Sequence, residues 1–174
     1  YQIEGAFDVD GRGDSVWDMF CREPGLVRDG TDGTVACDHY NRYKDDVAMM
    51  RDLSVKAYRL SVAWPRVLPE GVGKVNQAGL DFYDRLIDEI CAAGIDPWIT
   101  LFHWDFPTKL YDRGGWLNRD SSDWFTDYAS LICERYSDRV SNWFTLNEPQ
   151  CFLGLGHHRG QHAPGLKMSF EKVL

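Results

Sequence analysis

The sequence lacks several patterns that would assign it to common protein classes. No run of 18 apolar residues occurs along its 174 positions, so no transmembrane helix is expected. No GxGxxG pattern follows a predicted strand, which argues against a dinucleotide-binding fold. Lys and Arg number 19 against 27 for Asp and Glu, and the formal net charge is −8. That balance argues against a nucleic acid or an anionic membrane surface as partner.

The cysteines form no metal-type pattern. They are five in number, widely spaced and without a CxxC pair. Cys91 and Cys133 each follow an isoleucine at helical spacing, where a thiol acts as a small core residue. Because an odd, scattered set is typical of reduced thiols, a cytoplasmic location is expected. No signal peptide is visible, and the sequence opens at Tyr1, inside a motif described below.

Aromatic residues are the main surplus. They make up 14% of the chain, with seven Trp and eight Tyr. Apolar residues at 44% and charged residues at 26% are values typical of a globular domain with a substantial core. The aromatic surplus fits such a core, and it also fits a sugar-binding cleft, where flat rings pack on the apolar faces of pyranoses.

Helical periodicity marks several stretches. A short helix is expected around 15–20, and a longer one begins at Asp38, whose side chain can cap the first turn. Further helices are predicted over about 76–93, ending at Gly94, and over roughly 121–137, and another can begin at 150–156. The buried stripe of the 76–93 helix is predicted to consist of Phe82, Tyr83, Leu86, Ile87 and Ile90.

Three β-prone stretches, 57–64, 97–102 and 143–149, alternate with these helices. The first alternates apolar residues with Arg59 and Ser61, so one face is apolar and the other carries an arginine. Strands joined by helical crossovers pair in parallel, in either an open doubly wound sheet or a closed (β/α)₈ barrel. Polar and aromatic strand ends favour the α/β TIM barrel. Since a full barrel needs roughly 250 residues, the chain is expected to hold part of one.

The stretch 143–149 ends abruptly in an amide, a carboxylate and a proline. It is predicted to bury Phe144 and Leu146 and to present Asn147 and Glu148 at its carboxyl end, where barrel active sites lie. Pro149 has no N–H and stops the strand. Taken alone, the same pattern also fits a buried strand followed by a polar turn.

Six short motifs in order connect these stretches to a known family. They are Tyr-Gln-Ile-Glu-Gly-Ala at 1–6, Tyr-Arg-Leu-Ser-Val-Ala-Trp-Pro-Arg at 58–66, Leu-Phe-His-Trp-Asp at 101–105, Gly-Gly-Trp at 114–116, Thr-Leu-Asn-Glu-Pro at 145–149 and His-Ala-Pro-Gly at 162–165. In order and spacing the chain resembles family 1 glycoside hydrolases, the β-glucosidase and β-galactosidase group. The resemblance implies that residues 1–174 are the N-terminal part of a single (β/α)₈ domain. They would hold strands 2–4, helices 1–3 and loops, without the first strand.

The resemblance also implies an enzyme and a mechanism. It implies a retaining β-glycosidase that removes the terminal nonreducing β-linked sugar of an oligosaccharide or of an aryl or alkyl β-glycoside by double displacement. Glu148 would be the general acid/base, and Arg59 would orient the nucleophilic glutamate. Four residues would bind the sugar: Asn147 at its 2-hydroxyl, Gln2 and His103 at other hydroxyls, and Trp104 as a wall of the pocket.

The sequence departs from the family pattern at a few positions. Leu60 replaces a common Phe, and Gln150 stands where an aromatic residue commonly follows Asn-Glu-Pro. The nucleophile's motif, of the Thr/Ser-Glu-Asn-Gly type, does not occur in the 174 residues. Retention requires two carboxyls about 5–5.5 Å apart. The chain alone is therefore predicted to be inactive, with the nucleophile supplied by a C-terminal part.

Other interpretations remain open at this point. The parent protein could act on 6-phosphoglycosides, or the chain could be a non-catalytic carbohydrate-binding half-barrel that self-associates or pairs with a complementing half. Without the motif, Arg59 could be a buried ion-paired arginine and His103 a core histidine. A metal reading of His158 and His162 is disfavoured by the Pro-Gly that follows, so neither a metal nor a cofactor is expected.

Overall fold

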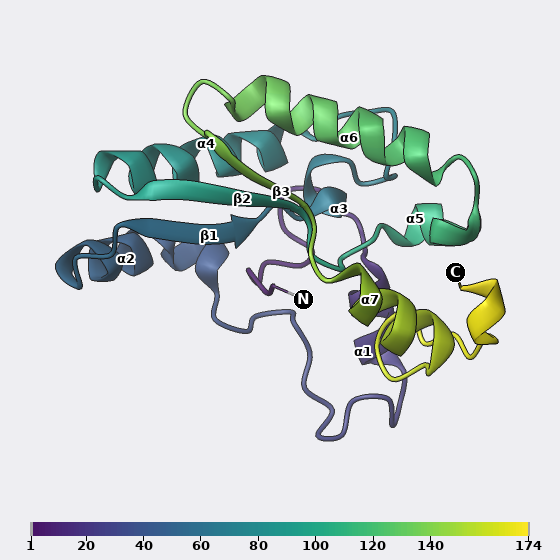
Figure 1. The fold of residues 1–174 in the computed structure, drawn as a ribbon. Coiled ribbons are helices and arrows are strands. Elements are labelled where there is room, and N and C mark those ends of the chain that lie inside the picture. Colours follow the sequence, from purple (N-terminus) through teal and green to yellow (C-terminus); the bar gives the residue numbers. More distant parts are fainter. Residues whose placement is uncertain (1, 174) are drawn as a thin grey trace.

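Three parallel strands form one sheet in the order β1-β2-β3 in the computed structural model, which describes residues 2–173 (Figure 1). The strands are β1 (Ala57–Ser61), β2 (Asp96–Phe102) and β3 (Asn142–Leu146). Ala57 pairs with Asp96 in the first ladder, and Trp98 pairs with Asn142 in the second. All three carboxyl ends therefore meet at one edge of the sheet, as the sequence predicted.

Three long helices pack on one face of this sheet. They are α2 (His39–Asp52), α4 (Gln77–Ala92) and α6 (Ser121–Tyr136), and Figure 1 shows α4 and α6 lying along the strands. The Tyr128 hydroxyl of α6 donates to the main-chain oxygens of Val62 and Leu101, at 3.1 and 2.8 Å. The predicted stripe of α4 is confirmed, because all five of its members are buried, and Gly94 follows the helix with a φ of 71°.

Seven shorter elements complete the described chain. They lie in the loops around the long helices, and Figure 1 places α1, α3, α5 and α7 toward the carboxyl ends of the strands. The predicted 150–156 helix is present as α7 followed by a π-helical stretch. The seven are α1 (Val16–Arg22), α3 (Trp64–Val67), α5 (Thr108–Tyr111), η1 (Gly115–Leu117), α7 (Pro149–Cys151), η2 (Phe152–His158) and η3 (Phe170–Lys172). No helix among residues 2–173 has the length and hydropathy that crossing a membrane requires.

The first strand is shorter than predicted. β1 ends at Ser61, and Trp64 begins the helical turn α3 instead of extending the strand to residue 64. Pro65 occupies an N-terminal position of that turn, where a missing N–H costs nothing. The Trp64 indole donates to the Gly71 carbonyl at 2.9 Å and stacks on Tyr128 at 4.6 Å, so it is fixed as a core residue.

The predicted cap at Asp38 is wrong. Asp38 precedes α2 in a left-handed conformation with a φ of 54°, and its side chain makes no capping hydrogen bond. It accepts instead from the Asn41 side chain at 2.7 Å. The short helix α1 does have a side-chain cap, because Ser15 and Asp18 exchange hydrogen bonds as a capping box.

The predicted burial of Phe144 and Leu146 is also wrong. Phe144 is 36% exposed and Leu146 only partly buried. β3 is the last strand of the described sheet, and Phe144 lies on the face that carries Arg59, which the long helices do not cover. The side chain is covered by Trp98, at 5.8 Å between ring centroids, and by the Arg59 guanidinium, at 4.4 Å.

A buried charged cluster fixes the N-terminal loop to α3 and α4. Arg66 is fully buried and pairs with the Glu4 carboxylate. It also donates to the carbonyls of Gly5 and Ala6, at 3.2 and 3.0 Å. The Tyr83 hydroxyl of α4 donates to the second Glu4 oxygen at 2.8 Å. The segment that carries Gln2 therefore starts from a rigid anchor.

Candidate active site at the carboxyl ends of the strands

Polar and aromatic side chains gather where β1, β2 and β3 end. Arg59 lies on β1, His103 and Trp104 follow β2, and Asn147 and Glu148 follow β3. Because the strands are parallel and paired in register, the same edge of the sheet carries all five. In barrels this edge is the one that carries ligand and catalytic groups.

Asn147 is the centre of the observed contacts. Its side-chain oxygen accepts from Arg59 Nη2 at 2.7 Å, and its main-chain oxygen accepts from the Trp104 indole at 2.8 Å. Its own N–H donates to the Phe102 carbonyl at 2.9 Å, which continues the β2–β3 ladder by one step. Its amide also approaches Glu148 Oε2 at 3.4 Å. The predicted residues Arg59, Trp104, Asn147 and Glu148 are thus brought together.

Arg59 is held by partners on two neighbouring strands. Besides its bond to Asn147, its Nε donates to Thr100 Oγ1 on β2 at 3.0 Å, and its guanidinium lies over Phe144 on β3. The alternative reading as a buried, ion-paired arginine is wrong, because the residue is exposed. It forms no salt bridge within the described chain. Its charge is therefore available to an anion at this edge.

Glu148 stands in a left-handed turn between β3 and α7. Its φ is 43°, a conformation that costs a non-glycine residue energy, and Pro149 follows as the first residue of α7. The side chain is exposed, so a ligand above the sheet edge can reach it. Glu148 directly follows β3, and no glutamate takes the corresponding place after β1 or β2 in the described structure.

His103 and Trp104 form the adjoining wall. Their ring centroids lie 5.6 Å apart, and Trp104 has a φ of 83°, which turns its indole toward Asn147. Burial, with a smaller contribution from the Arg59 charge, lowers the pKa of His103 to about 4. Its Nδ1 is buried and has no hydrogen-bond partner among residues 2–173. At neutral pH the ring is uncharged and can accept or donate a hydrogen bond to a ligand.

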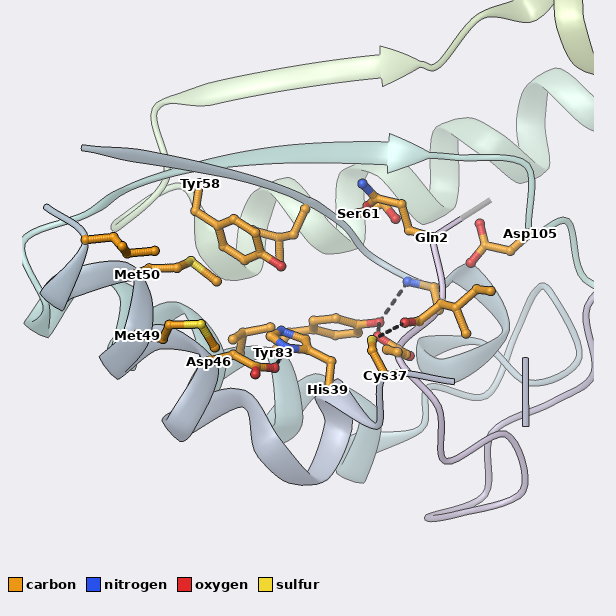
Figure 2. A pocket seen from close by; sticks show the side chains of 16 residues that line it. Gln2, Cys37, His39, Asp46, Met49, Met50, Tyr58, Ser61, Tyr83 and Asp105 are labelled. Carbon is orange, nitrogen blue, oxygen red and sulfur yellow. Dashed lines mark hydrogen bonds and ion pairs between the residues drawn. The ribbon is translucent and has the colours of Figure 1, made fainter. Parts of the chain in front are cut away.

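Gln2 reaches the same edge without joining the Asn147 contacts. Figure 2 shows it near Ser61 and Asp105, at the rim of a cavity of about 420 Å³ that extends below β1. Its motif begins at Tyr1, which lies outside the described residues. No hydrogen bond joins Gln2 to the other five predicted residues in the described structure.

The sequence reading missed two features beside the site. The Glu4–Arg66–Tyr83 cluster was not foreseen, although the arginine of Trp-Pro-Arg inside an apolar stretch is a signal for a buried charge partner. Asp105, the last residue of the Leu-Phe-His-Trp-Asp motif, has an Oδ1 that is buried without a partner in the described chain. No group of three or more metal-type side chains converges among residues 2–173.

The chain is similar to known proteins over nearly its whole length. The sequence model of the family described as "Glycosyl hydrolase family 1" matches residues 1–174. Beta-glucosidase A of Acetivibrio thermocellus is 54% identical over 96% of this chain and 37% of its own length. Aryl-phospho-beta-D-glucosidase BglC of Bacillus subtilis is 49% identical over 96% of this chain and 35% of its own.

Solved structures agree with the sequence matches. The family 1 β-glucosidase from Thermotoga maritima superposes with a TM-score of 0.95 at 52% identity, covering 97% of this chain and 38% of that one. The chain thus spans a little over a third of the length of the relatives it matches. Its parallel strands and covering helices are part of a TIM barrel. By sequence and by structure, the chain belongs to glycoside hydrolase family 1.

Proposed function

We propose that this chain supplies the acid/base half of the active site of a retaining β-glycosidase. The observation that carries the proposal is the contact set around Asn147, which joins Arg59, Trp104 and the Glu148 turn at one sheet edge. This arrangement offers a proton donor, an amide, an indole and an unpaired cation to one ligand. A sugar with an oxygen leaving group needs that combination of groups.

The proposed chemistry uses Glu148 twice. In the first step its proton goes to the leaving glycosidic oxygen while a second carboxylate attacks the anomeric carbon. In the second step Glu148, now ionised, takes a proton from the water that displaces this carboxylate, and the sugar leaves with its configuration retained. The second carboxylate belongs to the remainder of the domain, and the exposed Arg59 charge would hold it in its ionised form.

The binding roles follow from the same geometry. The Asn147 amide, steadied by Arg59, would donate to the 2-hydroxyl of the sugar. Neutral His103 would bind a further hydroxyl, and Gln2 would do so from the opposite rim. Trp104, fixed by its bond to the Asn147 carbonyl, would pack against the sugar face.

The proposed substrate class is a β-glucoside with an unphosphorylated terminal sugar. The relatives named β-glucosidase support it, as do the Thermotoga maritima enzyme structures with castanospermine and with deoxynojirimycin. A 6-phosphoglycoside is the second candidate, supported by the Bacillus subtilis relative. A non-catalytic binding half-barrel is the third, and the absence of turnover in the completed domain would favour it.

A chimera tests the proposal directly. This chain would replace the matching segment of the Thermotoga maritima β-glucosidase, to which it is 52% identical with a TM-score of 0.95. We expect hydrolysis of aryl β-glucosides by the chimera. The Glu148→Gln chimera should lose roughly 10²–10⁴-fold in kcat/KM with an alkyl leaving group, which needs protonation, and much less in the first step with dinitrophenol.

Two comparisons make this experiment decisive. Faster turnover of the 6-phosphoglucoside than of the plain glucoside by the chimera would replace the first candidate with the second. An equal loss for both leaving groups on Glu148→Gln would contradict the acid/base role. The 174-residue chain alone should give no turnover of an aryl β-glucoside, and activity that disappears on Glu148→Gln would contradict that expectation.

We also propose that the protein works in a reducing compartment, the cytoplasm. Four of its cysteines, Cys37, Cys91, Cys133 and Cys151, are free thiols in the structure. The prediction that Cys91 and Cys133 are small core residues is wrong, because Cys91 is exposed and Cys133 only partly buried. Their partial desolvation still raises the pKa of both thiols, which disfavours the reactive thiolate. Immunodetection in fractionated source cells tests the location, and a signal confined to the secreted fraction would contradict it.

A further inference from the structure

Asp105 is a buried carboxyl that the proposed chemistry does not use. It follows Trp104 after the end of β2, and the residue is only 4% exposed. Its Oδ1 has no hydrogen-bond partner among residues 2–173. Buried polar atoms in proteins are nearly always hydrogen-bonded, because leaving one without a partner destabilises the fold.

Asp105 lines the cavity of about 420 Å³ described above and also a small second cavity. This cavity has a volume of about 10 Å³, which is close to the minimum needed by one water molecule. Besides Asp105, the residues that line it include 2–5, Arg12 and Asp18. Several polar groups around a volume of one water are the conditions under which buried water is retained.

The same cavity lies between two segments that are fixed independently. On one side Glu4 is anchored by Arg66 and Tyr83. On the other side the residues after Asp105 are bonded to the start of α1, where the Val16 N–H donates to the Phe106 carbonyl at 2.8 Å. Between these anchors, the described structure offers no direct hydrogen bond from the Asp105 Oδ1 to the loop that carries Gln2.

We propose that Asp105 is a positioning residue that, through one buried water, fixes residues 2–5 against the end of β2. The water accepts from or donates to the Asp105 carboxyl on one side and main-chain groups of residues 2–5 on the other. The bridge sets the position of Gln2 relative to His103 and Trp104, which stand directly before Asp105. That Gln2 binds a sugar hydroxyl rests on the proposed function, whereas the anchoring itself does not.

The charges around the cavity agree with a neutral Asp105. Burial raises its pKa to about 7, and the Glu4 charge adds to this effect, while Arg12 and the N–H of Asp105 itself act in the opposite direction. Arg12 is already paired with Asp18 at 2.9 Å. Burial and the Asp105 charge raise the pKa of Tyr128, so this side chain has no charge at neutral pH. A neutral carboxyl is both donor and acceptor, so it can hold a water in either orientation.

Amide hydrogen exchange tests the bridge without any assay of activity. Three variants of the full 174-residue chain are compared: Asp105→Asn, Asp105→Leu and, as a control with the same change at an exposed loop position, Asp112→Leu. We expect amide exchange at residues 3–5 to be roughly tenfold faster in Asp105→Leu, because the variant loses the stabilisation that one hydrogen bond provides. Asp105→Asn, which keeps a donor and an acceptor, should stay within roughly threefold of wild type, as should Asp112→Leu.

Infrared spectroscopy covers the case in which Asp105→Leu does not fold. At pH 5.5 wild type should show the C=O band of a protonated, hydrogen-bonded carboxyl, and Asp105→Asn should lack it. Wild-type exchange at residues 3–5 in a folded Asp105→Leu chain overturns the proposal, and so does a spectrum in which Asp105→Asn removes no carboxyl band. Both measurements are unaffected if the chimera shows no glycosidase activity.

Discussion

The Arg59 guanidinium donates to the Asn147 side chain at 2.7 Å and so joins the first strand of the sheet to the turn after the third. The same guanidinium donates to Thr100 on the strand between them. Both hydrogen bonds of Arg59 can form only when the three strands are in register.

A double-mutant cycle measures the Arg59–Asn147 contact. Arg59→Met, Asn147→Ala and the double variant are unfolded with urea, and we expect a coupling free energy of about 1 kcal/mol, as for a hydrogen bond to a charged donor at a half-exposed site. The exposed pair Arg51–Asp52 serves as control, with coupling below about 0.5 kcal/mol. Additive effects at Arg59 and Asn147 would contradict the contact.

Loss of the Glu4 charge should strongly destabilise the fold. Glu4→Gln leaves Arg66, which is fully buried, without a counter-charge, and breaking a buried pair costs about 3–5 kcal/mol. The matched control is Asp14→Asn, which breaks the half-exposed pair with Arg22 and should cost less than about 1 kcal/mol. Urea unfolding of both variants gives the comparison. Equal costs would show that Arg66 finds another partner.

Gly79 should not tolerate alanine. A Cβ at this position in α4 would lie 2.2 Å from the Arg66 carbonyl oxygen, so the helix or the arginine turn must shift. We expect a loss of roughly 1–3 kcal/mol, as for other overpacked sites. Gly154→Ala is the control, because nothing lies within 4 Å of its added Cβ, and it should change stability by less than about 0.5 kcal/mol. Thermal unfolding of both variants measures these losses of stability.

The His103 ring should make stability fall in mild acid. Burial lowers its pKa from 6.5 to about 4, so between these values the unfolded chain binds a proton that the folded chain excludes. The contribution is fully present above pH 6.5 and is lost as pH falls toward 4. Because the ring is half exposed, we expect the free energy of unfolding to fall by roughly 1–2 kcal/mol over this range. In urea titrations from pH 4 to 7, His103→Gln should flatten this slope.

Asp105 should act in the opposite direction. Burial raises its pKa from 3.8 to about 7, so the folded chain holds a proton that the unfolded chain has released. The contribution is fully present below pH 3.8, is lost as pH rises toward 7 and does not change further above that pH. Asp105→Asn removes this penalty, and its stability relative to wild type should rise by about 2–3 kcal/mol between pH 5 and pH 8. A constant difference across that range would contradict the buried neutral carboxyl.

Much of the framework could be predicted from local patterns. The apolar period of α4 and the glycine after it gave the helix to within one residue, and the apolar run at 97–102 gave β2 to within one residue. Strand and helix alternation then required parallel pairing, which brought Arg59, His103, Trp104, Asn147 and Glu148 to one edge. Such features depend on neighbours in the sequence, where periodicity carries the information.

The misjudged features depend on contacts across the sequence. Whether Phe144 is buried is decided by what lies over the face of β3 that carries no helix, and the alternation of residues along β3 does not state this. Trp64 left the predicted strand because Pro65 favours a helical turn and the indole fits beside Tyr128. Asp38 has the residue type of a cap but the wrong backbone conformation. The Asn147 contacts and the Asp105 cavity were unforeseen for the same reason.

The register of the sheet has a consequence for folding kinetics. Ala57 meets Asp96, and Trp98 meets Asn142, across crossovers that each contain a long helix, so no local turn can start either ladder. Topologies dominated by such distant pairings reach their transition state slowly, because chain entropy is lost before contacts form. We therefore expect the edge that carries Glu148 to become ordered only after both crossovers have closed.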